Sequence, residues 1–256
     1  MAKPSKNRER TDRIEQMRRE TKRAERRRTL VVVGICGVLA LGIVGATGWK
    51  LYSDSQRDAE VEGTDLAAIG ASAAAAGCQD VVTEPADGSA QHVDPDPVDY
   101  GDSPPAFGAH WQTPAEFERK FYTDEDRPEV ERIVHNLEHG YTVLWYDETI
   151  ADDAAALGTV EDLGTKFEVG GIEELGNDLE TYNANKFLAV PWTSEDGEPF
   201  PDDTHVAMTR WAAEGEGAVE GQGLGAWEYC EAPSGEAVAD FMAEYPAENA
   251  LEPNGG

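Results

Sequence analysis

The sequence predicts an α+β protein in which one N-terminal transmembrane helix is followed by a small, mostly antiparallel sheet packed with helices. Two observations support this fold class. An uncharged apolar stretch, Leu30–Gly48, separates a basic N-terminal segment from the long acidic remainder of the 256-residue chain. In that remainder, short segments rich in valine and aromatic residues, which are typical of strands, are interspersed with segments that have helical spacing.

The apolar stretch has the length of a membrane-spanning helix. Its 19 residues carry no charged side chain. At a rise of about 1.5 Å per residue they extend about 29 Å, close to the hydrocarbon thickness of a bilayer. The rival interpretation is a cleaved signal peptide, but the basic segment and the apolar stretch are both longer than is usual in such peptides. We therefore expect an uncleaved helix over residues 29–49.

The distribution of charge predicts the orientation of the chain. Residues 1–28 contain 12 Lys or Arg and 5 Asp or Glu, a net charge of +7. The residues after the apolar stretch contain 9 basic and 46 acidic side chains, a net charge of −37. Basic residues beside a span favour the cytoplasmic side. We expect a single-pass protein of the cell membrane with a cytoplasmic N-terminus and an extracytoplasmic C-terminal domain.

The same features divide the chain into segments and limit its partners. The acidic domain excludes nucleic acid, since phosphate contacts need clustered lysine and arginine. The basic arm instead predicts contact with the lipid bilayer and, at its surface, with anionic lipid headgroups. The expected segments are a basic cytoplasmic arm (1–28), the transmembrane helix (29–49), an acidic, alanine-rich linker (50–77), an extracytoplasmic domain (78–245) and a disordered tail (246–256).

Within the domain, helices are expected to cover one face of the sheet. Pro128 is expected to open a short helix and Gly140 to close it, directly before the first strand. Ser234 is expected to cap the last helix, which runs to Tyr245. The expected strands are 141–146, 187–192 and 205–211, and the expected helices between the first two strands are 150–166 and 172–185.

Two of the three cysteines are expected to form a disulfide. Cys36 lies within the apolar stretch, whereas Cys78 and Cys230 bracket the folded region. An oxidising compartment outside the cytoplasm favours pairing of Cys78 with Cys230 over the alternative of two free thiols.

Three of the five histidines form a candidate metal site. His135 and His139 are four residues apart, so they share one face of a helix, and His110 follows a Pro-Pro loop that can hold it nearby. Neutral imidazoles are ligands for copper and zinc, and affinity is expected to fall as the pH drops through about 6.5. The alternative is that these histidines only hydrogen-bond the turn into residues 141–146.

Two further patterns bear on this site. The segment His135–His139 matches the H-x-x-E-H pattern of inverted zinc proteases, but Gly140 follows at once in place of the long helix which that mechanism needs. Met208 would favour copper as a soft ligand, although methionine in a strand more often belongs to the core. His205 and Met208 have opposite parity, so a regular strand cannot direct both to one site. His92, in an acidic, proline-rich loop, is expected to contribute least.

At these motifs the chain resembles a family of membrane-anchored extracytoplasmic proteins of actinobacteria and archaea, grouped as domain of unknown function 3105. The resemblance covers roughly residues 78–245, and the block VHNLEHG at residues 134–140 is its specific part. Phe107 and Tyr141 depart from the family pattern. The other matching elements are His92-Val93, the Pro104-Pro105…Gly108…His110 loop, Trp145-Tyr146 and the MTRW strand that ends at Trp211.

The resemblance implies an anchored domain of unknown activity, whose gene often neighbours those of small His/Met-rich proteins linked to copper handling. The family's polar motif positions correspond to His110, His135, Glu138 and His139. We expect the domain to bind copper, or else zinc, through His110, His135 and His139, with a metal-handling protein of the cell envelope as partner. One alternative is an accessory domain of an envelope complex without metal.

The other alternative is a small metal-dependent hydrolase in which Glu138 acts as general base. The sequence contains no G-x-S-x-G elbow, phosphate-binding glycine loop or dinucleotide fingerprint. No catalytic residue is therefore expected apart from Glu138 under this alternative, and a role other than catalysis is favoured.

Overall fold

The structure is a computed structural model that describes residues 6–86, 90–168 and 178–255. The chain forms two compact units, with the boundary between Arg57 and Asp58. The first unit is helical and the second contains the sheet.

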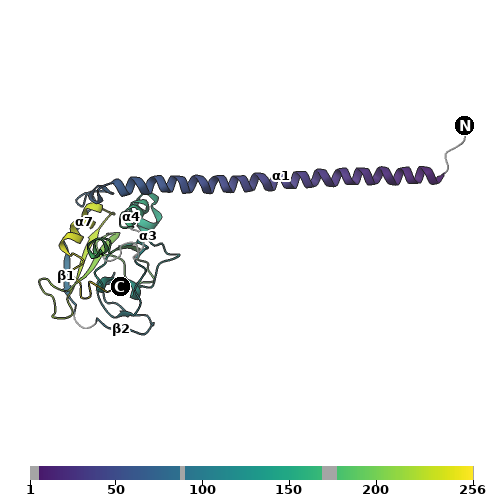
Figure 1. Cartoon of the computed structure of the whole chain (residues 1–256). Coiled ribbons are helices and arrows are strands. Elements are labelled where there is room, and N and C mark those ends of the chain that lie inside the picture. Colours follow the sequence, from purple (N-terminus) through teal and green to yellow (C-terminus); the bar gives the residue numbers. More distant parts are fainter. Residues whose placement is uncertain (1–5, 87–89, 169–177, 256) are drawn as a thin grey trace. The chain divides into compact units, whose positions relative to one another are not determined.

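The long N-terminal helix, α1 (Lys6–Gly63), contains the apolar stretch (Figure 1). Its most apolar window has a mean hydropathy of 2.5, and none of that window is buried. Large side chains such as Leu30 and Leu41 are exposed along it. By length and composition, this helix is able to cross a membrane. The final turns of α1 belong to the second unit, where Val61 is buried in the core.

The second unit is built on a five-stranded sheet in the order β1-β7-β6-β4-β5. All neighbours are antiparallel except β4 and β5, which pair in parallel with Thr142 opposite Phe187. The predicted α+β class with a mostly antiparallel sheet is therefore confirmed. The strands are β1 (Val82–Pro85), β4 (Thr142–Tyr146), β5 (Phe187–Pro191), β6 (Val206–Ala212) and β7 (Leu224–Cys230).

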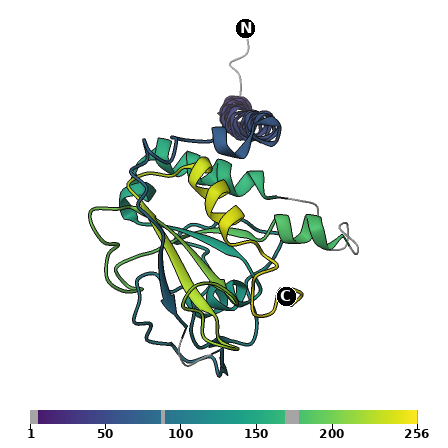
Figure 2. The same ribbon diagram turned by 90° about the vertical axis from the view of Figure 1, so that its left-hand side faces the viewer.

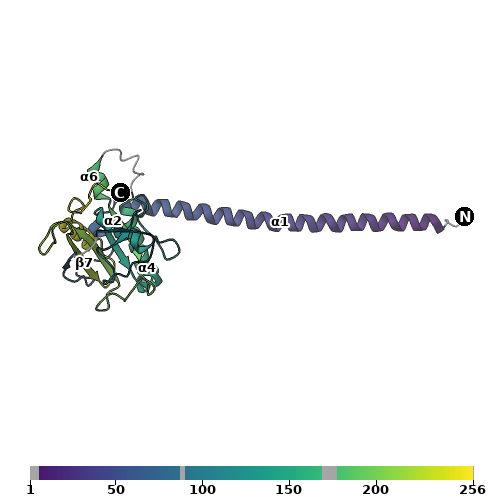
Figure 3. The same ribbon diagram turned by 90° about the horizontal axis from the view of Figure 1, so that it is seen from below.

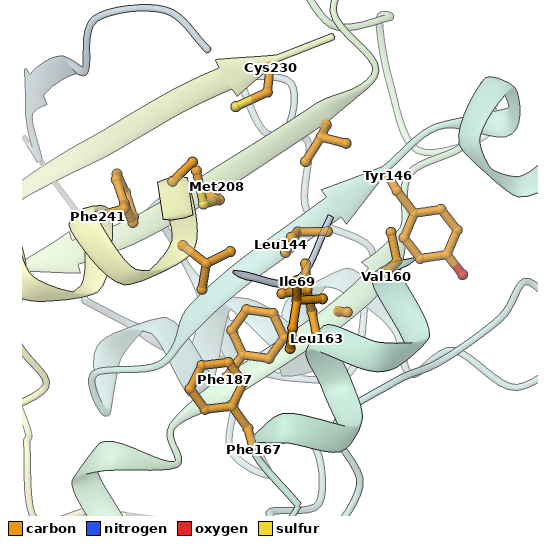
Figure 4. Packing of buried hydrophobic residues seen from close by; sticks show 14 of the residues in the cluster. Ile69, Leu144, Tyr146, Val160, Leu163, Phe167, Phe187, Met208, Cys230 and Phe241 are labelled. Carbon is orange, nitrogen blue, oxygen red and sulfur yellow. The ribbon is translucent and has the colours of Figure 1, made fainter. Parts of the chain in front are cut away.

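Both faces of the sheet are covered at its centre, because alternate residues of β4, β5 and β6 enter two different cores. Leu144 and Met208 belong to the first core, together with side chains of α4 (Ala154–Lys166) and α7 (Gly235–Glu244) (Figure 4). Figure 2 shows α4 and α7 along the same side of the sheet. Val143, Trp145 and Trp211 enter the second core, which is covered by α2 (Val130–Glu138). The expectation that helices cover one face is therefore wrong for α2.

The predicted elements agree with the structure except at some boundaries and over residues 150–166, where the predicted single helix is two helices separated at Asp153. Helix α2 begins at Val130, two residues after Pro128, and Gly140 follows its end with a φ of +89°. Part of the predicted helix 172–185 is α6, and residues 169–177 lie outside the described part of the chain. The remaining elements are η1 (Leu66–Ala68), α3 (Glu148–Asp152), α6 (Leu179–Ala184) and a separate parallel pair, β2 (His92–Val93) and β3 (His110–Trp111).

Cys78 and Cys230 form a disulfide, as the sequence predicts. It ties the segment before β1 to the end of β7. The third cysteine, Cys36, is free and exposed on α1.

The C-terminal segment differs from the expected disordered tail. Ala247 and Ala250 are buried, and the Glu252 N–H donates to the carbonyl oxygen of Glu138 at 3.1 Å. The C-terminus accordingly lies close to α2 (Figure 3). Small side chains let this segment approach the end of α2, and the free carbonyl at that end accepts its N–H.

Candidate metal centre

Helix α2 places three polar side chains beside the second core. Ile133, Val134 and Leu137 are fully buried against the sheet, which fixes the rotation of the helix. His135, Glu138 and His139 are also almost completely buried, at 4%, 3% and 5% exposure. Burying a polar group costs free energy unless it has a hydrogen-bond or ionic partner. The partners of these three side chains therefore indicate what the site can bind.

The short parallel pair β2–β3 brings two more histidines to the same place. His92 and His110 are direct partners in its register, and the His110 N–H donates to the carbonyl of Gln91 at 3.0 Å. The ring centroids of His110 and His135 are 4.9 Å apart. The edge of the Trp211 ring packs against His110, with a centroid distance of 5.9 Å. Below, "histidine cluster" means His92, His110, His135 and His139 together with Glu138.

Three imidazoles of the histidine cluster make the same kind of contact through Nδ1. The Nδ1 atoms of His110, His135 and His139 face the carbonyl oxygens of Gly108, Trp111 and Glu252 at 2.8, 2.5 and 3.0 Å, respectively. A carbonyl oxygen can only accept, so each Nδ1 carries the hydrogen and donates it. In a neutral imidazole, Nε2 is then left with its free lone pair, the tautomer that metal-ligating histidines adopt in this arrangement.

Each of these Nε2 atoms lies next to another acceptor atom of the cluster. The Nε2 atoms of His135 and His139 are 2.7 Å apart, and Nε2 of His110 lies 2.9 Å from Oε2 of Glu138. Ligand atoms of His135, Glu138 and His139 all lie within 4.8 Å of one another. Neutral imidazoles and an ionised carboxylate supply only acceptors at these four atoms, so the cluster needs a cation, either protons or a metal ion.

Electrostatics favour the neutral imidazole and the ionised carboxylate. Burial, with a contribution from the neighbouring histidines, lowers the pKa of His135 to about 4, although its bond to Trp111 opposes this shift. Burial alone would raise the pKa of Glu138, but the contact with His110 and the adjacent imidazoles lower it overall. His135 therefore stays neutral well below the pH of about 6.5 that an unperturbed histidine would give.

The structure excludes Met208 and His205, two further candidates from the sequence, from the metal site. Met208 faces the opposite core, beside Leu144, and cannot join the histidine cluster. His205 precedes β6, and its Nδ1 lies 2.8 Å from Oδ2 of Asp147. Another group with ligand-type side chains, Cys78, Glu228 and Cys230, offers no free thiol because the two cysteines are joined.

The sequence analysis missed the contribution of the C-terminal segment to the site. Besides the Glu252 carbonyl, Gly255 lies against His139, where a Cβ atom would be 2.2 Å from Cε1 of that ring. The buried Lys186 links the end of α2 to the C-terminal segment, since its Nζ donates to the carbonyls of His139 and Pro253 at 2.8 and 2.6 Å. These contacts connect residues distant in sequence, and only the glycines near the end of the chain hinted at a close approach.

The comparisons with known proteins place this site within a family. Residues 92–255 match the family described as protein of unknown function DUF3105. The chain belongs to the DUF3105 family. The matched region begins at His92 and ends at Gly255, so it contains the whole histidine cluster and the C-terminal segment that covers it. In this DUF3105 domain, Phe107, one of the two departures from the family pattern, packs beside Trp211 and Trp227. No curated protein and no solved structure matches the chain.

Proposed function

We propose that this protein is a membrane-anchored, extracytoplasmic DUF3105 domain that binds one divalent transition-metal ion, zinc or copper. His110, His135 and His139 supply three nitrogen ligands, and Glu138 supplies a carboxylate oxygen. The observation that carries this proposal is that all three imidazoles donate Nδ1–H to a backbone carbonyl and present Nε2 to another member of the cluster, His135 to His139 and His110 to Glu138.

The chemistry of the ligands limits the kind of metal. Three imidazole nitrogens and one carboxylate oxygen suit zinc in a four-coordinate site, and imidazoles also suit copper(II). Because Met208 lies in the opposite core, the thioether that would have favoured copper(I) is not part of the set. Zinc and copper(II) are therefore proposed on equal terms.

Metal binding is favoured over metal-dependent hydrolysis. In the hydrolase alternative, Glu138 would act as a general base toward a metal-bound water. Its Oε2 atom is instead 2.9 Å from Nε2 of His110, within the converging group of ligand atoms. A carboxylate that coordinates the ion is not free to accept the proton of a bound water.

The test is a calorimetric titration of the full-length protein, in detergent micelles and without a polyhistidine tag, with zinc chloride and with copper(II) chloride. We expect saturable binding of about one ion per chain, because the ligand atoms are preorganised by backbone hydrogen bonds. Only the heat of dilution with both metals would contradict the proposal and favour an accessory domain in which protons bridge the cluster.

The proposed location rests on α1 and on the charges that flank its apolar stretch. Twelve Lys or Arg residues precede the stretch, and they would face the cytoplasm and contact anionic lipid headgroups there. The disulfide between Cys78 and Cys230 is consistent with an oxidising compartment for the second unit. An envelope protein that donates or accepts the metal ion would be the partner.

Protease added to intact cells should digest the chain beyond residue 63 and spare residues 1–28, which a peptide antibody against the arm would detect. The expected result follows from the charge asymmetry across Leu30–Gly48. Lysed cells, in which both parts are digested, serve as the control. If the second unit is digested only after lysis, the orientation is reversed. If the mature chain begins near residue 50, the apolar stretch is a signal peptide.

A further inference from the structure

We propose that an incoming metal ion is bound first by an outer set of ligands, His92, His110 and His135. It then exchanges His92 for Glu138 and His139 to reach its final position. This inference rests on the proposed function and adds the route by which a hydrated divalent cation enters the buried site. His92 is then a transfer ligand, needed for loading but not for the affinity of the final site.

Two overlapping ligand sets are present in the structure. Ligand atoms of His92, His110 and His135 lie within 4.8 Å of one another, and the same limit holds for His135, Glu138 and His139. His135 belongs to both sets. An ion that moves between the two positions therefore remains bound to His135 throughout, and no step leaves it without a protein ligand.

The two sets differ in their exposure to solvent. The side chain of His92 is 41% exposed, whereas that of Glu138 is 5% exposed. His110 and His135 of the outer set are 0% and 4% exposed, and His139 is 5% exposed, so His92 is the exposed member. A hydrated ion can therefore reach His92 directly, whereas every other ligand of the two sets is buried.

A surface hollow leads to His92. It has a volume of about 690 Å³ and is lined by His92, Asp94, Asp96 and Gln112, among others. The carboxylates of Asp94 and Asp96 give this mouth a negative potential, which raises the local concentration of cations and their association rate. The hollow thus combines cation attraction with an exposed imidazole.

The fold holds His92 against the ligands with which it would exchange the ion. Its ring centroid lies 4.8 Å from that of His110 and 4.9 Å from that of His135. Its Nε2 atom is 4.0 Å from Oε2 of Glu138, beyond hydrogen-bond distance but close enough for ligand exchange around one ion. The β2–β3 register, which pairs His92 with His110, fixes this position.

Stopped-flow mixing of the full-length protein with copper(II) chloride tests the route. Copper(II) bound beside His110 should quench the fluorescence of Trp211, whose ring packs on that histidine. We expect His92→Ala to lower the association and dissociation rates by about tenfold each, with little change in affinity or in the stoichiometry of one. Asp94→Asn combined with Asp96→Asn should slow association and flatten its dependence on ionic strength.

His205→Ala is the matched control, because His205 contacts Asp147 outside the histidine cluster, and its rates should equal those of the wild type. If calorimetry of the same wild-type sample shows no binding of either copper(II) or zinc, the proposed function itself fails. If the wild type binds copper and His92→Ala loads as fast, the site stands and the route is wrong. A fall of about 100-fold in affinity with an unchanged association rate would make His92 a permanent ligand and would also overturn the route.

Discussion

Replacing His135 with alanine should lower the affinity for zinc or copper(II) at least about 100-fold, since even the loss of a group that only supports a ligand costs 10- to 100-fold. His135 is expected to have a strong effect because it offers a ligand atom within 4.8 Å of those of His92 and His110 and also of those of Glu138 and His139. The measurement is the calorimetric titration of the full-length protein described above. His139→Ala should have a similar effect on the final site, because His139 Nε2 lies 2.7 Å from that of His135.

Two controls separate loss of ligands from loss of structure. His205→Ala removes an imidazole of the same size from a position outside the histidine cluster, and it should bind metal as the wild type does. Circular dichroism of His135→Ala should show an unchanged helix and strand content. If the double variant His135→Ala/His139→Ala binds as tightly as the wild type, these histidines only support the turn into β4.

Removal of the disulfide should destabilise the second unit by about 4–5 kcal/mol in the chain-entropy model, because the bond closes a very long loop. Cys78 and Cys230 are separated by 152 positions in the sequence. Cys230→Ser should therefore lower the melting temperature by about 10 °C or more. Thermal and urea unfolding of the full-length protein, followed by tryptophan fluorescence, measures both quantities.

Reduction of the wild type should reproduce the stability of Cys230→Ser. Cys36→Ser is the matched control, since Cys36 is free and lies on α1, and its unfolding should be that of the wild type. Two free thiols beyond Cys36, titrated in the unreduced and denatured protein, would show that the pair does not form.

The part of the site that could be predicted from sequence is the part set by local geometry. His135, Glu138 and His139 lie within five residues, and the helical repeat alone places them near one another. The opposite parity of His205 and Met208 likewise follows from the repeat of a strand, and β6 directs Met208 away from the histidine cluster.

Contacts between distant segments were harder to predict. The C-terminal segment looked like a tail because it is short and polar, yet the Glu252 carbonyl accepts from His139, and Lys186 binds the carbonyl of Pro253. The position of His92 in the site depends on a two-residue parallel pairing with His110, and no periodic pattern in the sequence predicts this pairing. Strand β7 was missed as well, although Leu224, Ala226 and Cys230 belong to the first core at even-numbered spacing.

The fold class was predictable because it depends on composition and on strongly apolar segments. The covering of both sheet faces was missed, although β4 and β5 contain apolar runs that lack the alternation of a half-exposed strand. Such runs are typical of strands buried on both sides. All residues of β4, β5 and β6 are indeed buried, so α2 covers the face that the prediction left open.

X-ray absorption at the zinc edge tests the central claim most directly, because it reports the atoms bound to the ion. The sample is the full-length protein without a polyhistidine tag, loaded with one equivalent of zinc and then desalted. We predict retained zinc with only nitrogen and oxygen neighbours at about 2.0–2.2 Å and with the multiple scattering of about three imidazoles. Loss of the ion on desalting both from this sample and from one loaded with copper(II), or a sulfur neighbour at about 2.3 Å, would contradict the account.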